Sequence, residues 1–505
     1  MKLAFGKLAV YAVTLVAGAT VANADCPDYT TYSSSPQGNP STGPLGLPYM
    51  RPDPGCRTFN STIVEKVITD MKSRLKDPDV ARLFENTFPN TLDTTVKYYD
   101  PSVNLAFIIT GVPQWLRDTG NQFAHYHSLL SLDKELATLV KAVINNEARY
   151  VTEYPYCGAF QPPPESGLQP SHNDWADGVI VNPPVDNETV YECKYEVDSL
   201  CGFIKLSVSY YEETKDASMM NSNWLSAIDQ IFRVINEQSQ ASFDADFNFI
   251  SYYNWTGTPG AYSGAVDNAG NGEPKGYTGM VGTHHRPSDD LSVFAFLTPA
   301  NAMLTVELNN LATILDDAKI APNVSAQAKK WSKSIEEAIW KHTLVDNIFA
   351  YETNGLGSRY VMDDANVPSL LSLPYLGFLN MTHPAYLATR KLLMSRHNPY
   401  YAKGKTFSGI GGPHIDAWNP WPMSQVSAIF GTDNDEEILT SLYTIVNNTA
   451  GLGLIHESID IYDTTQYTRP WFAWANSYFA EMLLDLAQRK PHLIFTDNKP
   501  YTPGM

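Results

Sequence analysis

Apolar residues recur three or four positions apart over several long segments of the chain, as they do on the buried face of an amphipathic α-helix. One such run consists of Ala300, Leu304, Leu308, Leu311 and Leu315. The preceding Thr298-Pro299 predicts an N-cap and a proline at the first helical position. Two further runs have the same spacing: Ala328, Trp331, Ile335 and Ala338, and Phe472, Ala475, Phe479, Met482 and Leu486. We also expect helices over residues 61–75, 121–131, 133–149, 197–213 and 222–238.

The helical segments are separated by long loops rich in glycine, proline and aromatic residues, for example 161–185, 256–280 and 404–419. Alternation of apolar and polar residues with period two, which is typical of strands, is sparse. The pattern therefore predicts an all-α fold, a toroid of helices with its loops gathered over one end. Long loops in a compact domain are usually either functional or evidence of a wrong element assignment. The polar clusters described below lie within or beside them, which favours function.

The composition is that of a globular protein, with 43% hydrophobic and 18% charged residues among 505. The net charge of −19 argues against a nucleic-acid partner, because phosphate binding requires clustered lysine and arginine. There is no CxxC or HExxH spacing and no GxSxG elbow, and the glycine-rich segment 409–414 lacks the GK[ST] ending of a phosphate-binding loop. The first absence makes a structural zinc site unlikely, and the second disfavours a serine esterase. We expect no bound metal and no cofactor.

The N-terminus has the pattern of a signal peptide. Lys2 and Lys7 are followed by the apolar run 8–18 and by a small-residue cleavage site at 22–24. This run is too short to span a bilayer, which disfavours the alternative of an uncleaved membrane anchor. We expect a secreted protein, by default a monomer, with these parts: signal peptide 1–24, ordered arm 25–57, single catalytic domain 58–495 and C-terminal tail 496–505.

Secretion accounts for two further features of the chain. Six Asn-x-Ser/Thr sequons predict N-glycosylation: Asn60, Asn187, Asn254, Asn323, Asn380 and Asn447. Five cysteines allow disulfide bonds in an oxidising compartment and leave at least one thiol unpaired. We expect the pairs Cys26–Cys56 and Cys157–Cys193, with Cys201 free in an apolar setting.

Two polar clusters far apart in the chain carry acidic residues among aromatic ones. The first is RPSDD at 286–290, and the second is HES at 456–458, followed by the segment 468–477. A glycosidase needs one carboxylic acid to protonate the leaving oxygen and one carboxylate to activate water. The candidates are Asp289, Asp290 and Glu457. Adjacent acids raise each other's pKa, which suits a general acid.

Each cluster also has a purely structural interpretation. Asp289 and Asp290 are typical of the first turn of a helix, and Glu457 is well placed to form an ion pair with Arg469. His456 or a neighbouring hydroxyl is the alternative partner that would orient Glu457.

A third polar segment, WLRD, suits sugar binding, since Arg117 and Asp118 can form paired hydrogen bonds to hydroxyl groups and Trp115 can stack on a pyranose ring. The alternative is a structural ion pair beside a core tryptophan. Glu196 and Asp198 begin a predicted helix, and we expect them to be caps.

Taken together, these clusters resemble glycoside hydrolase family 125, the metal-independent exo-α-1,6-mannosidases. The matching segments follow one another in family order between residues 55 and 490, at 109–118, 194–201, 286–290, 364–371, 409–414, 453–458 and 468–477. The resemblance implies an (α/α)6 toroid whose loops form the active-site face. It also implies inverting hydrolysis of terminal, non-reducing α-1,6-linked mannose from an oligosaccharide or glycan.

The resemblance places the general acid within 286–290, where we favour Asp289 over Asp290, and makes Glu457 the base. It implies these substrate-binding residues: Trp115, Arg117, Asp118, His414, Arg469 and Trp471. The segments 111–114 and 282–285 differ from the family pattern. They leave two alternatives open: an enzyme for another α-linked hexose or linkage, and a secreted carbohydrate-binding protein without catalysis.

Overall fold

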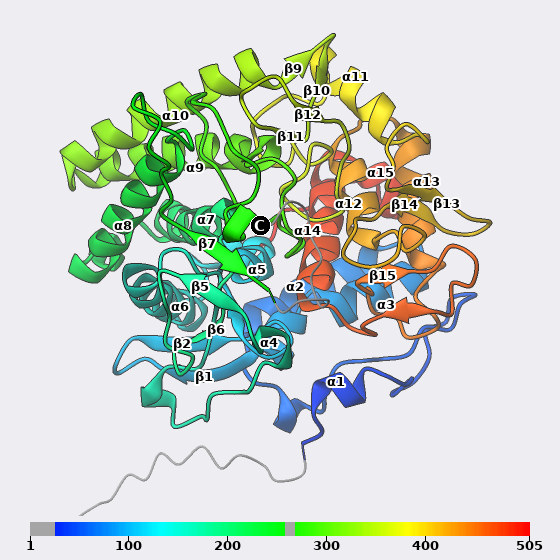
Figure 1. Ribbon diagram of the computed structural model, residues 1–505. Helices are drawn as coiled ribbons and strands as arrows, with labels where there is room; N and C mark the ends of the chain where they lie inside the picture. Colours follow the sequence, from blue (N-terminus) through cyan, green and yellow to red (C-terminus); the bar gives the residue numbers. More distant parts are fainter. Residues whose placement is uncertain (1–25, 258–267, 505) are drawn as a thin grey trace, which may run out of the picture.

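The computed structural model describes residues 26–257 and 268–504, and most of its regular structure is α-helical (Figure 1). The expected signal peptide and part of the 256–280 loop lie outside the described residues. The helices are α1 (Tyr29–Tyr32), α2 (Thr62–Arg74), α3 (Pro78–Thr87), α4 (Asn90–Thr94), α5 (Leu116–Gln122), α6 (Lys134–Glu153), α7 (Val197–Thr214), α8 (Ser222–Gln238), α9 (Thr298–Ala318), α10 (Pro322–His342), α11 (Pro384–Leu393), α12 (Pro422–Phe430), α13 (Asp435–Val446), α14 (Ala473–Arg489) and α15 (Pro491–Ile494).

The predicted helices lie close to their expected positions. The runs at 300–315, 328–338 and 472–486 fall in α9, α10 and α14, and the whole first run is buried. Two details were wrong. Helix α9 begins at Thr298 with Leu297 as its N-cap, and the Thr298 hydroxyl makes no hydrogen bond. The helix expected at 121–131 is instead the end of α5 followed by a 3-10 helix, Ala124–Leu129.

The helices pack as an inner row with a second layer outside it. Helix α7 contacts α5 on one side and α9 on the other, and α14 contacts α5 and α12. Outside this row, α10 packs on α9, α6 packs on α7 and α8, and α13 packs on α12. In Figure 1, α5, α7 and α14 lie near the middle of the view, whereas α10, α8 and α13 lie at its edge. The prediction of a mostly helical fold is confirmed.

Small antiparallel sheets in the loops were not predicted. The strands are β1 (Val96–Asp100), β2 (Leu105–Ile108), β3 (Gln114–Trp115), β4 (Ala159–Phe160), β5 (Ile180–Asn182), β6 (Val190–Glu192), β7 (Asn254–Thr256), β8 (Phe296–Leu297), β9 (Leu344–Val345), β10 (Ile348–Phe349), β11 (Glu352–Thr353), β12 (Arg359–Tyr360), β13 (Tyr401–Lys403), β14 (Ser408–Ile410), β15 (Ser458–Ile459) and β16 (Tyr467–Thr468). They pair in the orders β1-β2, β3-β4-β6, β5-β7, β12-β11-β8, β10-β9, β13-β14 and β15-β16. Most have two or three residues, which is too short for a period-two pattern to show in the sequence.

Helices α5 and α7 touch backbone to backbone, and two glycines make this possible. A Cβ on Gly202 of α7 would lie 2.7 Å from the Leu116 carbonyl oxygen, and one on Gly120 of α5 would lie 2.9 Å from the Gly202 carbonyl oxygen. Real Cβ atoms do not approach oxygen this closely, so larger side chains would force the helices apart. The contact brings the first turn of α5, with Arg117, beside the start of α7.

The predicted cysteine pairing is confirmed. Cys26 is bonded to Cys56 and Cys157 to Cys193, and Cys201 is a buried free thiol. The first disulfide closes the N-terminal arm on itself. Buried Arg51 joins the arm to the helical body, since its Nε donates a hydrogen bond to Asp93 Oδ2 at 2.7 Å.

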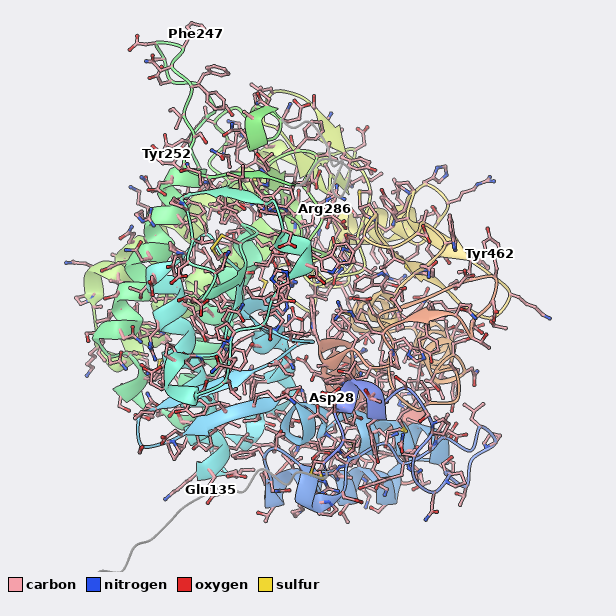
Figure 2. All side chains as sticks on the ribbon, turned by 60° about the horizontal axis from the view of Figure 1, so that its bottom comes forward. Asp28, Glu135, Phe247, Tyr252, Arg286 and Tyr462 are labelled. Atoms are coloured by element: carbon pink, nitrogen blue, oxygen red, sulfur yellow. A yellow bond between two sulfur atoms is a disulfide. The ribbon has the colours of Figure 1, made fainter. Side chains whose placement is uncertain are left out.

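Figure 2 labels side chains of very different exposure. Phe247 and Tyr462 stand out at the surface, with 85% and 81% of their area exposed, whereas Arg286 is 2% exposed. Asn254 in β7 is the half-buried sequon asparagine, and the remaining sequon asparagines are exposed: Asn60, Asn187, Asn323, Asn380 and Asn447. Across residues 26–257 and 268–504, no helix has the length and apolar character needed to cross a bilayer.

Candidate active site

A pocket gathers side chains from segments that are far apart in the chain. It contains about 390 Å³ of empty space, part of it open to solvent. Its walls are Thr110, Trp115, Arg117, Asp118, Pro287, Ser288, Asp289, Asn366, His414, Trp421, Glu457, Arg469, Phe472 and Trp474. The pocket therefore brings together seven of the predicted site residues: Trp115, Arg117, Asp118, Asp289, His414, Glu457 and Arg469.

The RPSDD segment is a tight turn, so its interpretation as the first turn of a helix is wrong. The Arg286 N–H donates to the Asp290 carbonyl at 2.8 Å, and the Asp289 N–H donates to the Arg286 carbonyl at 2.9 Å. Asp289 has a backbone φ of +69°, in the left-handed region that aspartate tolerates better than most residues. The turn presents the Asp289 side chain to the pocket.

Arg286 anchors this turn through a buried ion pair. Its Nε donates to Glu352 Oε1 at 2.6 Å. The other oxygen of Glu352 accepts the N–H groups of Val293 and Phe294, each at 3.0 Å. Breaking a buried pair by removing one partner typically costs about 3–5 kcal/mol. The Arg286–Glu352 pair thus fixes the residues that flank the turn on its C-terminal side as well as the turn itself.

The two aspartates of the turn have different surroundings. Ser288 Oγ donates to Asp290 Oδ2 at 2.8 Å, and His414 Nδ1 lies 3.7 Å from Asp290 Oδ1. Asp289 is part of the pocket wall, and Asp290 is not. The geometry therefore favours Asp289 as the carboxyl group that meets a ligand.

Arg117 lies at the centre of a buried cluster of carboxyl groups. Its Nη1 forms an ion pair with Glu196 and lies 3.7 Å from Asp198 Oδ2. Its Nη2 donates to Asp289 Oδ1 at 3.3 Å, and its Nε lies 3.3 Å from Asp118 Oδ1. Glu196 stands at the N-cap position of α7, but its side chain makes no capping hydrogen bond. The expectation that Glu196 is a cap is therefore wrong.

Two tryptophan rings hold the Arg117 guanidinium. Its Cζ lies 5.6 Å from the ring centre of Trp115 and 5.5 Å from that of Trp474. Both rings also line the pocket. Cation–π contacts of this kind stabilise a guanidinium that is shielded from water, so Arg117 has little freedom to move when a ligand enters.

One guanidinium cannot neutralise four neighbouring carboxylates, and the pKa values in the cluster separate accordingly. Burial raises the pKa of Glu196 well above its usual value, although Arg117 opposes this. Burial also raises the pKa values of Asp118 and Asp198 to about 6. For Asp289, burial is outweighed by Lys194 and Arg117, and its pKa is lowered. The pKa values of the two carboxyl groups that share Arg117 are thus shifted in opposite directions, that of Glu196 upward and that of Asp289 downward.

Glu457, which also lines the pocket, is held by the segment 468–469. Its backbone N–H donates to the Thr468 carbonyl at 3.3 Å, just before β15 pairs with β16. Arg469 Nε lies 3.0 Å from Glu457 Oε1. The ion pair anticipated as a structural alternative is therefore present, within the pocket wall.

His414 and His456 play different parts. Burial opposes a charge on His414, but Asp290, Asp289 and Glu457 outweigh it and raise its pKa. The His456 ring stacks on Tyr467 with centres 3.9 Å apart, and its Nδ1 lies 2.9 Å from the Pro470 carbonyl oxygen. Its contacts support the β16 side of the loop, and it is not His456 that pairs with Glu457.

Trp471 is not among the residues that line the pocket, so its part in substrate binding stays a prediction. Its ring meets Tyr29 edge-on at 4.8 Å, and its Nε1 donates to Asn90 Oδ1 at 2.5 Å. The Trp474 ring faces the pocket instead. Helical spacing alone could not reveal this, because Trp471 precedes the N-cap of α14 and does not follow the helical period.

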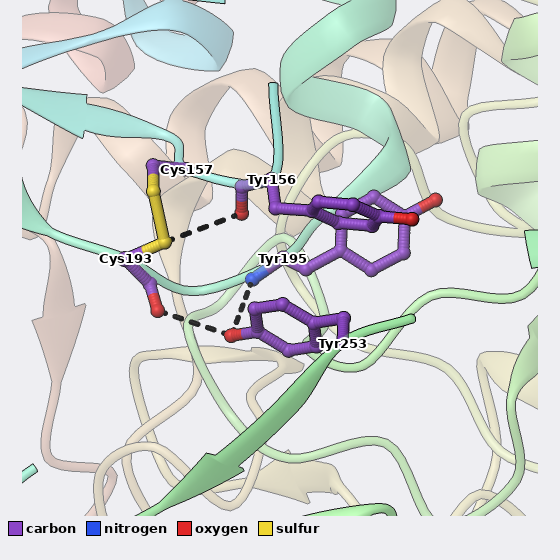
Figure 3. The surroundings of a disulfide bond; sticks show 5 residues. All are labelled: Tyr156, Cys157, Cys193, Tyr195 and Tyr253. Carbon is purple, nitrogen blue, oxygen red and sulfur yellow. Dashed lines mark hydrogen bonds between the residues drawn. A yellow bond between two sulfur atoms is a disulfide. The ribbon is translucent and has the colours of Figure 1, made fainter. Parts of the chain in front are cut away.

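The segment that leads into α7 is braced by an aromatic cluster beside a disulfide (Figure 3). The Tyr253 hydroxyl donates to the Cys193 carbonyl at 3.0 Å and accepts the Tyr195 N–H at 3.2 Å. The Tyr156 ring stacks on Tyr253 and meets Tyr195 edge-on. The Cys157–Cys193 bond joins the segment just before β4 to the residue that follows β6. These contacts fix the backbone from which Lys194 and Glu196 project.

Several residues in or near the pocket were not singled out as site residues from the sequence. Lys194 does not line the pocket; it is buried behind it, with its Nζ 3.0 Å from Glu192 Oε1, and it acts electrostatically on Asp289. Its position two residues before Glu196 was the available signal. The remaining wall residues carry no chemical motif of their own: Thr110, Pro287, Ser288, Asn366, Trp421, Phe472 and Trp474.

The chain is similar to known proteins over most of its length. The family described as metal-independent alpha-mannosidase (GH125) matches residues 77–484. The Schizosaccharomyces pombe protein named Meiotically up-regulated gene 157 protein is 45% identical over 482 residues, which cover 93% of this chain and 94% of that protein. A Streptococcus pneumoniae structure from a family of metal-independent alpha mannosidases, described as a non-productive complex with alpha-1,6-mannobiose, is 29% identical. It covers 85% of this chain and 99% of its own, with a TM-score of 0.78.

Proposed function

Because the chain belongs to the GH125 family of metal-independent alpha-mannosidases, we propose that it removes terminal, non-reducing α-1,6-linked mannose from glycans with inversion at the anomeric carbon. The observation that carries the proposal is the shared pocket of Asp289 and Glu457, each fixed by its own arginine. The choice of linkage rests on the likeness to the Streptococcus pneumoniae structure, which was described with alpha-1,6-mannobiose.

In the proposed reaction the two carboxyl groups act in a single displacement. Asp289 gives a proton to the glycosidic oxygen as the bond from that oxygen to the anomeric carbon breaks. Glu457 takes a proton from water as the water oxygen attacks the same carbon from the opposite face. Inverting enzymes keep their two carboxyl groups roughly 6.5–9.5 Å apart, which leaves room for the water.

The remaining predicted residues would bind the sugar in the pocket. Asp118 accepts hydrogen bonds from hydroxyl groups, and Trp115 offers an apolar ring face on which a pyranose stacks. Arg469 holds Glu457, and its side chain is half exposed at the pocket. His414, beside Asp290, can donate a hydrogen bond to the substrate.

We also propose that the helices form an (α/α)6 toroid within a catalytic domain of residues 58–495, preceded by an arm at 25–57 and followed by a tail at 496–505. The proposal is supported by the inner row of α9, α7, α5, α14 and α12 and by the outer helices packed on it. The likeness in fold to the Streptococcus pneumoniae structure also supports it.

A further part of the proposal is that the protein is secreted after removal of residues 1–24 and is N-glycosylated, and that it acts as a monomer. Two disulfides and the exposed sequon asparagines support secretion and glycosylation, whereas a monomer is the default. Mass spectrometry of the natural protein should find Asp25 at the N-terminus and a loss of mass on glycan release. Light scattering should give the mass of one chain. An intact N-terminus or an unmodified mass would contradict secretion or glycosylation, respectively.

The function is tested by incubating the purified protein with α-1,6-linked mannobiose and following the products by proton NMR. Initial release of β-mannose by the wild type, and not by Glu457→Gln, is expected. Initial release of α-mannose would contradict inversion. If no mannose is released, a panel of other linkages and α-linked hexoses separates an enzyme of different specificity from a binding protein without catalysis.

A further inference from the structure

Glu196 and Asp289 are two carboxyl groups joined both directly and through one cation. Arg117 contacts Glu196 through Nη1 and Asp289 through Nη2. The two carboxyl groups also interact directly: Asp289 raises the pKa of Glu196, and Glu196 lowers the pKa of Asp289. Two carboxyl groups can hydrogen-bond to each other only when one of them carries a proton. Glu196 is enclosed in the protein, whereas the Asp289 side chain, 20% exposed, reaches the pocket.

The cations around Glu196 and Asp289 are too few to neutralise all of the neighbouring carboxyl groups. The facing groups are Arg117 and Asp118 on α5, Asp198 on α7, Glu192 and Lys194 in the segment before α7, and His414. Lys194 is engaged with Glu192, and Arg117 is shared among four carboxyl groups. Buried like charges at this spacing cannot all be ionised. The cluster therefore retains protons at neutral pH.

Asp289 by itself is a poor resting acid. A general acid must hold its proton at the working pH. Asp289 accepts a hydrogen bond from Arg117 and lies in the field of Lys194, and both cations favour its ionised form. Asp289 could still act as the general acid if a neighbouring carboxyl group held the proton for it.

We propose that Glu196 is a positioning residue that stores the proton Asp289 delivers, so that the two carboxyl groups act as one donor. The inference rests on the proposed function. The proton passes from Glu196 to Asp289 while Asp289 protonates the glycosidic oxygen, which leaves with the cleaved bond's electron pair. The pair is then doubly ionised beside Arg117 and Lys194. The proton that Glu457 took from water goes to solvent, and solvent returns one to the pair.

The test uses Glu196→Gln in the full-length protein. Glutamine has nearly the size of a protonated glutamate and can donate an N–H to Asp289, so the thermal midpoint should stay close to that of the wild type. It cannot, however, give up a proton. Asp289 alone holds a proton only at lower pH, so the alkaline limb of kcat/KM on mannobiose should move down by about one pH unit or more. Hydrolysis of α-mannosyl fluoride, whose leaving group needs no proton donor, should remain close to that of the wild type.

Two further variants test the direction of the effect. Ser199 Oγ donates to Glu196 Oε2 at 3.0 Å. Ser199→Ala removes a donor that stabilises the carboxylate, so the pair should hold its proton to higher pH and the alkaline limb should move up. Asp198→Asn removes a carboxyl group from the same guanidinium but none that bonds to Asp289. Its alkaline limb should move less than that of Glu196→Gln.

A measurement that does not depend on turnover separates this inference from the proposed function. The infrared difference spectrum of wild type minus Glu196→Gln near pH 7 should contain the C=O band of a protonated carboxyl. If the wild type releases no mannose but shows this band, the proposed function fails and the protonated pair stands. The inference is overturned if the wild type is active but the band is missing and the alkaline limb is unmoved. It is also overturned if Glu196→Gln slows mannobiose and fluoride hydrolysis equally.

Discussion

Arg469 Nε lies 3.0 Å from Glu457 Oε1, and the two side chains differ sharply in exposure, at 51% for the arginine and 7% for the glutamate. Gly111 lies next to this pair, since a Cβ on it would lie 3.3 Å from Arg469 Nη1. The candidate base is therefore fixed by a cation that solvent and ligand can both reach. The short segment 111–114 that departs from the family pattern lies beside Arg469 at Gly111.

Replacing Glu457 by glutamine should remove catalysis and leave the fold intact. Glutamine keeps the size of the side chain but cannot accept a proton from water, and loss of a general base lowers kcat by about 10²–10⁴-fold. Steady-state kinetics on mannobiose with thermal unfolding of both proteins checks this. Exposed Arg359, changed to glutamine, provides a surface control. Wild-type kcat in Glu457→Gln would exclude Glu457 as the base.

His414 should contribute stability that depends on pH. Its pKa in the folded protein is raised from 6.5 because nearby Asp290, Asp289 and Glu457 outweigh burial. A group with a raised folded-state pKa stabilises the protein fully below its unfolded pKa and loses that effect as pH rises through its folded pKa. The stability difference between wild type and His414→Gln should therefore be larger near pH 5.5 than near pH 8.

Urea unfolding at the two pH values measures this difference. His397→Gln, at an exposed position, is the matched control for loss of an imidazole. A difference that stays constant from the lower to the higher pH would show that His414 is not charged by its carboxylate neighbours.

Sequence periodicity located the helices because each buries a long apolar stripe, but it could not place side chains in the loops. The strands β15 and β16 are two residues long, which is too short for alternation of apolar and polar residues to predict the hairpin that brings Arg469 to Glu457. Likewise, the sequence RPSDD suits the start of a helix. Only the hydrogen bonds around Asp289 show that it forms a tight turn.

Contacts between distant segments decide the roles that local patterns left open. Glu196 occupies the N-cap position of α7, but its side chain forms an ion pair with Arg117 of α5. It therefore belongs to the buried carboxyl cluster around Arg117. The seven candidate residues that line the pocket were recognisable because charged and aromatic types stood together in the sequence. Lys194 and Trp474 were missed because their roles depend on which way buried side chains face.

Trp471 and Trp115 should respond differently to the same substitution. Trp471→Phe loses the Nε1–H bond to buried Asn90 Oδ1, and an unsatisfied buried acceptor costs about 1–3 kcal/mol. KM and kcat should stay unchanged, because Trp471 is not part of the pocket wall. Trp115→Phe should instead raise KM, because the ring lines the pocket and contacts Arg117. A raised KM in Trp471→Phe with unchanged stability would support it as a substrate-binding residue.

The two disulfides offer a matched pair in which stability and catalysis should separate. Cys157 and Cys193 are 36 residues apart and Cys26 and Cys56 are 30 apart, so chain entropy alone gives each bond about 4 kcal/mol. Changing either pair to serine should therefore lower the free energy of unfolding by similar amounts. Only loss of Cys157–Cys193 should also lower kcat, because that bond lies one residue before Lys194 and braces the segment carrying Glu196. Urea unfolding and mannobiose kinetics of both double variants measure the two effects. Equal losses of kcat, at a temperature where both remain folded, would show that the bond near the pocket has no special part in positioning the Arg117 cluster.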